Sequence, residues 1–377
     1  MKKKYIIFSM VILVLVTFIT SFNYFKTTNT YVEDNVNNQT RVTKGISMNL
    51  EQTAGAGDYK TVTQSGWPTE GYKFNAELSR CENGSEISWD DTKKAVIVSG
   101  NLADKCYVYF DIYQPTLAEY IKSQYTGTQG DNALYYHNST LTNGAGDNSY
   151  RYAGASDSVN NYICLGSDEA TCPDANLFRI IGVFGDKTKV IRAKSVGSKE
   201  WHTSSNKWSS SSLNTYLNGE YLTSLGTLAD KIATTTWKVG GGSYTYLLDV
   251  PKTAYQYEVG SSAWTTTYEA KLGLMYVSDY YYSASPSAWT LVGYNRSDAT
   301  KDYRAAKTTN WLFLGSKEWT ISCTSDTIDF AFYVHSTGYV ESDDVSFSFA
   351  VRPSFNLESS VKYVSGSGSI SDPVRVN

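Results

Sequence analysis

The sequence predicts an α+β protein, mainly β with some helix, that follows an amino-terminal membrane anchor. Short runs of β-branched and aromatic residues alternate with turns rich in Gly, Asn and Asp, a pattern typical of strands. Apolar residues at helical spacing are confined to a few short segments. With 377 residues in the chain, the part after the anchor is long enough for two domains.

Residues 1–26 are predicted to be a signal anchor. Residues 5–22 carry no charge, and as a helix they would extend about 27 Å, close to the thickness of a bilayer's hydrocarbon core. Lysines occupy positions 2 to 4, so the positive-inside rule places the carboxy-terminal ectodomain outside the cell. Aromatic residues at the end of the run argue against a cleaved signal peptide, although a secreted protein remains the alternative. The sequence has no second run of this length, so a single-pass protein of the cell membrane is expected.

The composition argues against nucleic-acid binding and against a metal centre. Lys and Arg number 33 and Asp and Glu number 37, so the chain has no basic field to hold a polyanion. The five cysteines form no CxxC motif, which fits disulfides in an oxidising compartment better than zinc. The three histidines, His137, His202 and His335, are scattered along the chain. No cofactor is expected.

A polar stalk and a small domain are predicted to follow the anchor. Residues 27–45 are rich in Asn and Thr, and residues 46–113 have the strand pattern of a small Ig-like β-sandwich. Alternation in its last strand places Cys106 on the inward face. Cys81 is its nearest partner, and a disulfide between them would stabilise this small domain by about 3 kcal/mol. Two free buried thiols are the alternative.

A capping-box pattern from Thr116 to Glu119 predicts a short helix in a linker, residues 114–129. The larger domain that follows, residues 130–377, is predicted to be α+β and to bind the ligand. Its expected elements are one strand hairpin, one helix that begins after a run of serines, and further strands. The ranges are 178–184 with 189–193 for the hairpin, 213–225 for the helix, and 232–239, 272–278, 311–314 and 319–323 for strands.

The cysteines of the larger domain are predicted to comprise one disulfide and one free thiol. Cys164 and Cys172 lie eight residues apart and are expected to close a loop just before the hairpin. Strand alternation then puts the remaining Cys323 on a buried face. A buried, inert thiol is therefore favoured over a nucleophile that would use His335 as its base.

Acidic residues near the carboxy terminus offer oxygen atoms of the kind that calcium prefers. Their spacing does not match an EF-hand loop, so solvated carboxylates in turns are the favoured interpretation, and no metal site is predicted. The residues are Asp326, Asp329, Glu341, Asp343 and Asp344.

Two strands near the carboxy terminus are predicted to present the binding face. In residues 330–334, alternation puts both phenylalanines inward and Tyr333 outward, with His335 following on the same side. In residues 345–351, the valines and phenylalanines are expected inward and the serines outward. An ordinary solvated sheet face is the alternative interpretation. The candidate ligand-binding residues are Tyr333, His335, Ser346, Ser348, Asp343 and Asp344.

Several long motifs resemble an uncharacterised family of exported Gram-positive surface proteins of the gut type. They include NYICLGSDEATCP, NLFRIIGVFGDKTKVIRA, GLMYVSDYYYS and NWLFLGSKEWTIS. The carboxy-terminal half is also similar, more weakly, to C-type-lectin-like and formylglycine-enzyme-like folds through the AlaValArgPro element at residues 350–353. Motifs matching the calcium-binding and catalytic residues of those folds are missing, so the resemblance implies a shape and no chemistry.

The composition of the larger domain favours recognition. Tyr, Ser, Asn and Trp are the residues that binding surfaces use for rigid aromatic contact and adaptable hydrogen bonding. We therefore expect a membrane-anchored extracellular recognition or adhesion protein of a bacterial cell surface, whose ligand is an unknown protein or glycan. The alternatives are a structural envelope protein without a ligand and an exported glycan or cell-wall hydrolase, which would need two carboxylates about 5 to 10 Å apart.

Overall fold

The computed structural model describes residues 45–63, 66–68, 71–101, 103–293 and 308–377. The chain divides into two compact units, Met1–Gln114 and Pro115–Asn377. The predicted anchor, and all of the predicted stalk except Gly45, fall outside the described ranges. Within these ranges, no helix is both long and apolar enough to cross a membrane. Strands form most of the regular structure and short helices lie between them, so the prediction of a mainly β protein with some helix is confirmed.

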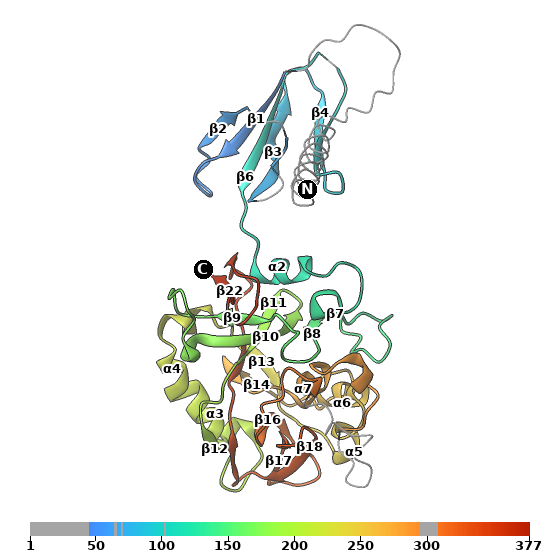
Figure 1. Ribbon diagram of the computed structural model, residues 1–377, viewed down its shortest axis with the longest axis vertical. Coiled ribbons are helices and arrows are strands. Elements are labelled where there is room, and N and C mark those ends of the chain that lie inside the picture. The colour runs from blue at the N-terminus through green and yellow to red at the C-terminus, as the bar shows by residue number, and fades with distance from the viewer. Residues whose placement is uncertain (1–44, 64–65, 69–70, 102, 294–307) are drawn as a thin grey trace, which may run out of the picture. The chain divides into compact units, whose positions relative to one another are not determined.

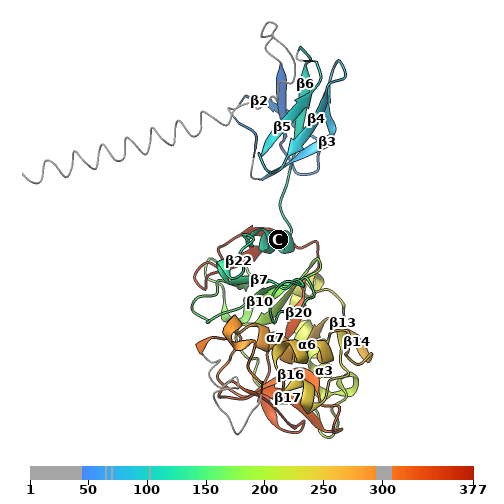
Figure 2. The same ribbon diagram turned by 90° about the vertical axis from the view of Figure 1, so that its right-hand side faces the viewer.

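The first unit contains a four-stranded sheet and a separate hairpin (Figures 1 and 2). The strand order in the sheet is β2-β1-β6-β3, and β1 and β6, the first and last strands, are parallel. The antiparallel hairpin is β4-β5. The strands are β1 (Ile46–Glu51), β2 (Tyr59–Val62), β3 (Tyr72–Cys81), β4 (Glu86–Asp90), β5 (Ala95–Ser99) and β6 (Cys106–Ile112).

The sheet and the hairpin of the first unit enclose one aromatic core. Phe110 in β6 is 1% exposed, and the rings of Trp89, Phe74 and Trp67 lie 5.6, 5.9 and 6.0 Å from it between centroids. Trp89 comes from the hairpin and Phe74 from the sheet, so the core joins the two layers. Inward residues of β6 alternate with half-buried ones, as the sequence pattern predicts.

The second unit is built on a nine-stranded sheet. Its main order is β15-β20-β11-β10-β9-β22-β21, and β8 joins it through β10 and carries β7. The predicted hairpin is confirmed as β10 and β11, which pair antiparallel at its centre. The strands are β7 (Leu134–Tyr136), β8 (Tyr150–Tyr152), β9 (Tyr162–Cys164), β10 (Leu177–Phe184), β11 (Lys187–Arg192), β15 (Leu272–Gly273), β20 (Ser354–Asn356), β21 (Tyr363–Ser365) and β22 (Val374–Val376).

Two smaller sheets complete the β structure of the second unit. One has the order β12-β19-β16-β17-β18, and the other is the pair β13-β14. Buried side chains from all three sheets belong to a single hydrophobic cluster, which includes the completely buried Trp201, Trp237 and Trp319. The strands are β12 (Ser198–Glu200), β13 (Thr235–Lys238), β14 (Thr267–Ala270), β16 (Glu318–Cys323), β17 (Phe330–Val334), β18 (Val340–Asp344) and β19 (Ser348–Ala350).

The helices of the second unit are short. Helix α3 begins after Ser211, which caps it as the serine run predicts, and it continues through a π-helical turn into α4. Helices α5, α6 and α7 pack in succession beside the sheets (Figure 1). The α-helices are α2 (Leu117–Ser123), α3 (Ser212–Tyr216), α4 (Leu222–Ser224), α5 (Tyr244–Leu247), α6 (Pro251–Glu258) and α7 (Val277–Tyr282), and the π-helical turn is Leu217–Tyr221. Short 3-10 turns occur at Asp131–Ala133, Asp174–Asn176, Trp208–Ser210, Gly226–Lys231 and Pro286–Ala288.

Helix α2 belongs to the second unit and is not part of a separate linker. Its capping box is formed as predicted by Thr116 and Glu119. Leu117 and Ile121 are buried in the main core of the second unit, and the backbone N–H of Leu117 donates to the carbonyl of Val361 at 2.8 Å. The helix is therefore anchored to the carboxy-terminal part of the chain.

The structure corrects three of the predicted elements. Residues 272–278 are strand only at Leu272–Gly273, because a capping box at Tyr276 and Asp279 begins helix α7 at Val277. Residues 311–314 form no strand. The backbone N–H of Trp311 donates to the carbonyl oxygen of Gly154, and its indole N–H donates to the carbonyl oxygen of Tyr152. The acidic stretch of residues 341–344, expected as a loop, lies in β18.

Both predicted disulfides are present, Cys81–Cys106 and Cys164–Cys172, and Cys323 is free and buried. Burial raises the pKa of the Cys323 thiol to about 11. The thiolate is the form that reacts with alkylating reagents, so the folded protein should keep this cysteine unreactive.

We expect Cys323 to be labelled by iodoacetamide only after denaturation. Peptide mapping of the non-reduced protein should recover the two disulfides and one alkylated peptide that contains Cys323. Fast labelling of the native protein, or a disulfide that includes Cys323, would contradict this assignment.

Candidate functional site

The six residues predicted to bind a ligand do not form one exposed face. Tyr333 is only 2% exposed, and its ring packs against Phe349 and Trp319 with centroids 4.7 and 6.0 Å away. Its hydroxyl donates to Glu341 at 3.2 Å. The outward orientation expected for Tyr333 is therefore wrong. The reason is that β17 lies between β16 and β18 in the sheet, and Trp319 of β16 and Phe349 of β19 flank the Tyr333 ring with large side chains.

The other five predicted residues lie nearer the surface. His335 is half-buried and stacks on Tyr339 with ring centroids 4.5 Å apart, while Asp343 lies 3.6 Å from the ammonium of Lys317. Asp344 accepts the backbone N–H of Ser346, which lowers the pKa of its carboxyl group. Ser346 and Ser348 are exposed as expected.

The neighbouring side chains also differ from the prediction. Phe347, expected inward, is 51% exposed. None of the six candidate residues lines the pocket beside the Cys164–Cys172 loop or the pocket between β11 and α7. Within the described ranges, no group of three His, Cys, Asp or Glu side chains is placed to hold a metal ion.

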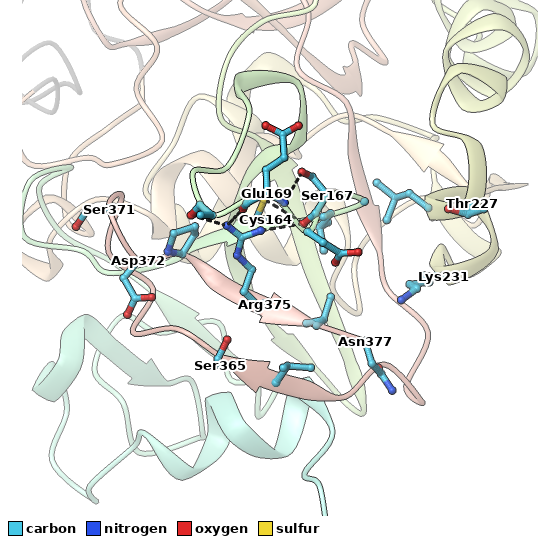
Figure 3. A pocket seen from close by; sticks show the side chains of 18 residues that line it. Cys164, Ser167, Glu169, Thr227, Lys231, Ser365, Ser371, Asp372, Arg375 and Asn377 are labelled. Atoms are coloured by element: carbon cyan, nitrogen blue, oxygen red, sulfur yellow. Dashed lines mark hydrogen bonds between the residues drawn. The ribbon is translucent and has the colours of Figure 1, made fainter.

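The larger of these pockets, of about 680 Å³, lies beside the Cys164–Cys172 loop (Figure 3). It is lined by that loop, by the 3-10 turn Gly226–Lys231 and by β21 and β22. The guanidinium of Arg375 is directed to the loop, where it donates to the carbonyl oxygens of Ser167 at 2.8 Å and Glu169 at 2.7 Å. This arginine therefore fastens the disulfide loop to β22 and is not left free for a ligand.

A smaller pocket of about 240 Å³ has a more distinctive chemistry. We call it the charged aromatic pocket. Strands β8, β11 and β13 and helices α6 and α7 contribute to it. Five charged residues, four aromatic residues, four uncharged polar residues and one valine line it: Asp147, Arg151, Lys189, Lys238, Asp279; Phe184, Trp237, Tyr255, Tyr276; Thr235, Thr236, Ser278, Asn356; and Val259.

Four of the charged residues, Asp147, Arg151, Lys189 and Asp279, form two linked ion pairs. The Lys189 ammonium lies 2.5 Å from Asp279 Oδ2, and Arg151 Nη2 lies 2.6 Å from Asp147 Oδ2. The two pairs meet where Arg151 Nη1 lies 3.7 Å from Asp279 Oδ1. The side chains of Arg151, Lys189 and Asp279 are 3, 6 and 3% exposed, and that of Asp147 is 17% exposed. Charges so deeply buried are rare unless they are paired.

Local structure positions each member of the cluster. Asp147 Oδ1 accepts both the backbone N–H and the hydroxyl of Ser149, which fixes its carboxylate just before β8. Arg151 lies opposite Gly182 in the pairing of β8 with β10, and a Cβ at Gly182 would overlap with the carbonyl oxygen of Tyr150. Glycine is thus required for the close approach of these strands.

Lys189 and Asp279 are fixed by regular structure. Lys189 lies on β11, in the central hairpin. Asp279 lies in the first turn of α7, where its Oδ2 also accepts the backbone N–H of Tyr276 at 2.9 Å. A helix cap and an ion pair therefore share one carboxylate.

The electrostatics of the cluster follow from burial and pairing. Burial acts to raise the pKa of Asp147, but the charge of Arg151 and hydrogen bonds from Ser149 outweigh it and lower that pKa to about 2. Burial lowers the pKa of Lys189, and the charge of Asp279 opposes this effect. For Arg151, burial is outweighed by the two carboxylates, and its pKa is raised. The arrangement stabilises charged forms of the pair formed by Arg151 and Asp147.

The carboxyl groups of Glu258 and Asp147 are both engaged by other groups of the protein. Burial raises the pKa of Glu258, but its carboxylate accepts the backbone N–H groups of Val277 and Ser278, both at 2.8 Å, and it does not line the pocket. Asp147, which does line it, has a lowered pKa. Four of the charged residues that line the pocket are held in ion pairs and offer both hydrogen-bond donors and acceptors.

Comparison with protein-family models finds no match. No curated protein is similar to the chain at a significant level. No solved structure is significantly similar either.

Sequence reasoning missed this pocket, although one signal was available. Asp279 stands in a run of bulky apolar and tyrosine residues, and Lys189 directly precedes the apolar pair Val190 and Ile191 in a predicted strand. A charge that interrupts a buried strand or helix needs a partner elsewhere in the fold. That reasoning identifies candidates but not their pairing, since the residues come from positions 147 to 279.

Replacing Tyr333 with alanine should destabilise the second unit, because it removes a buried aromatic side chain. We expect a loss of about 3 kcal/mol in the free energy of unfolding, measured by denaturant titration. Ser348→Ala, on the same sheet but exposed, is the control and should stay within about 0.5 kcal/mol of wild type. A Tyr333→Ala variant as stable as the control would contradict the observed packing.

The stability contributed by Asp147 should depend on pH in acid. Its pKa is depressed on folding, from 3.8 to about 2, so its contribution, about 2 kcal/mol, is complete above about pH 4 and declines as the pH falls towards 2. Denaturant unfolding of wild type and Asp147→Asn should therefore differ most near pH 6 and converge near pH 2. Asp157→Asn, at an exposed position, is the control, and its free energy of unfolding should follow that of wild type at every pH. A constant difference between wild type and Asp147→Asn would refute the ion pair.

Proposed function

We propose that the chain is an exported, membrane-anchored recognition protein of a bacterial cell surface, and that its second unit binds a small polar ligand in the charged aromatic pocket. The uncharged run of residues 5–22 behind three lysines supports an anchor. The two disulfides support an oxidising compartment outside the cytoplasm. The motifs that resemble exported Gram-positive proteins support the same location.

The observation that carries the binding proposal is the set of four charges at the base of an open pocket. Removing charges from water is costly, and a well-packed apolar core of the same volume is often at least as stable as a buried ion pair. Polar groups that converge in a pocket with aromatic walls are the usual form of a ligand site. Lys189 and Arg151 contribute cations and Asp147 and Asp279 contribute carboxylates, so the pocket offers both donors and acceptors.

A C-type-lectin-like arrangement of the second unit forms part of the proposal. It is supported by the element AlaValArgPro at residues 350–353, which follows β19. The arginine of this element, Arg352, is buried and makes a two-bond contact with Glu318 on β16 at 2.7 and 2.8 Å. That contact holds the end of β19 against β16, the central strand of the five-stranded sheet.

The hydrolase alternative lacks support in the charged aromatic pocket. Its lining carboxylates, Asp147 and Asp279, are each engaged in an ion pair with a cation of the cluster. A structural envelope protein without a ligand remains the competing function, and it differs from the proposal in one measurable respect: it would retain no small molecule.

Blocking the pocket from its rim should abolish binding. Thr236 is exposed on β13 and lines the pocket, so a tryptophan placed there would project over the opening. Thr234 is exposed in the same segment but does not line the pocket, which makes Thr234→Trp the matched control. Residues 45–377 contain both compact cores and are the protein to purify.

The protein should be screened against an array of saccharides, amino acids and short peptides. We expect at least one ligand to bind to wild type and to Thr234→Trp but not to Thr236→Trp, with all three proteins unfolding at similar temperatures. Retention of no compound by wild type, or equal retention by both variants, would overturn the proposal.

A further inference from the structure

The base of the charged aromatic pocket has unused hydrogen-bonding capacity at one point. Arg151 uses Nε on Ser149 at 2.8 Å and Nη2 on Asp147 at 2.6 Å. Its Nη1 has only Asp279 Oδ1 near it, at 3.7 Å, which is too long for a hydrogen bond. Among the described residues, this nitrogen has no acceptor within bonding distance.

Lys189 and Asp279, which lie in the same corner of the pocket, also have hydrogen-bonding capacity that the described residues do not use. The Lys189 ammonium has three N–H groups and, within the described part of the chain, one oxygen acceptor, Asp279 Oδ2. Asp279 Oδ1 accepts no hydrogen bond from the described residues. Two donors, Arg151 Nη1 and the Lys189 ammonium, therefore flank one acceptor, Asp279 Oδ1, and all three residues line the pocket.

A hydroxyl group fits this corner better than a charged group does. It can donate to Asp279 Oδ1 and accept from Arg151 or Lys189 at the same time. A ligand carboxylate or phosphate only accepts hydrogen bonds and would be repelled by Asp279, whereas an ammonium only donates and would be repelled by the two cations.

The charge balance of the cluster leads to the same conclusion. Arg151 and Lys189 are matched by Asp147 and Asp279, so the four buried side chains sum to zero. A ligand with a net charge would be desolvated there without compensation, which is costly. Lys238 is the remaining charged lining residue; it is half-buried at the rim and donates to the carbonyl of Gly260 at 3.1 Å.

The walls of the pocket suit a ring with apolar C–H groups. The Lys189 ammonium lies 4.4 Å from the centroid of the Tyr276 ring, and the Arg151 guanidinium lies 4.6 Å from that of Phe184. One face of each of these two rings is therefore directed at a cation. The rings of Phe184, Tyr255 and Tyr276 are only half-buried, so they keep accessible apolar surface among the residues that line the pocket. The volume of about 240 Å³ is below the usual range of about 300–1,000 Å³ for drug-sized ligands, so the space accommodates one ring.

Together these features lead to a ligand class, an inference that rests on the proposed function. We infer that the charged aromatic pocket takes a single neutral pyranose ring of a saccharide, with ring hydroxyls at Asp279, Arg151 and Lys189 and with its C–H face on the aromatic walls. Sequence-distant residues from β8, β11 and α7 then act as one sugar-binding corner.

A matched set of sugars tests the inference. Isothermal titration at pH 7 would compare a neutral methyl glycoside with the corresponding uronic acid and amino sugar, in the gluco, galacto and manno series. We expect at least one neutral glycoside to bind, and to bind at least tenfold more tightly than its two charged counterparts. Thr236→Trp should abolish this binding and Thr234→Trp should leave it unchanged.

Asp279→Asn provides a second test, because it gives the base a net positive charge. We expect this variant to lose affinity for the neutral glycoside and to bind the uronic acid more tightly relative to it, by about tenfold. Thermal unfolding checks that the variant folds, and if it does not, the selectivity of wild type decides alone.

The outcomes separate the inference from the proposed function. Equal or tighter binding of the uronic acid or the amino sugar by wild type would overturn the neutral-sugar inference. So would binding of amino acids or peptides, sensitive to Thr236→Trp, without any binding of saccharides, and in that case the proposed function would survive. Binding of no compound at all would overturn both.

Discussion

The second unit depends on the carboxylate of Asp279, which connects two distant strands to the start of its own helix. It pairs with Lys189 from the central hairpin, faces Arg151 from β8 and accepts the backbone N–H of Tyr276 at the start of α7. One side chain thereby sets the distance between the sheet and the helix. Losing a partner of a buried pair costs about 3–5 kcal/mol, so this connection constrains the sequence at several positions.

Part of the tyrosine content belongs to the core of the second unit and not to a recognition surface. Three successive tyrosines of α7 are buried, and their hydroxyls donate to the carbonyl oxygens of Gly338, Leu247 and Asn143. They serve as core side chains that also satisfy loop carbonyls, which an aliphatic residue could not do. A tyrosine-rich composition is therefore weak support for a recognition surface in this fold, and the stronger support comes from the pocket.

Short-range features were predictable from the sequence and long-range ones were not. The central hairpin, the capping box of α2 and both disulfides arise from residues close in sequence or from clear alternation. Alternation did not predict the burial of Tyr333. A strand in the middle of a sheet can be covered on both faces, and a period-two pattern then does not show which side chains are exposed. The charged aromatic pocket could not be assembled, since β8, β11 and α7 meet only through the tertiary fold.

The parallel pairing of β1 with β6 determines how the first unit would respond to tension. Because these are its first and last strands, a pull on the two ends acts in opposite directions along neighbouring strands and loads their hydrogen bonds in shear. The register from Ile46 opposite Cys106 to Leu50 opposite Phe110 must then give way collectively. Beyond that point, the disulfide from Cys81 to Cys106 stops the intervening chain from extending. The first unit should therefore resist extension along the chain more strongly than a domain whose terminal strands separate one hydrogen bond at a time.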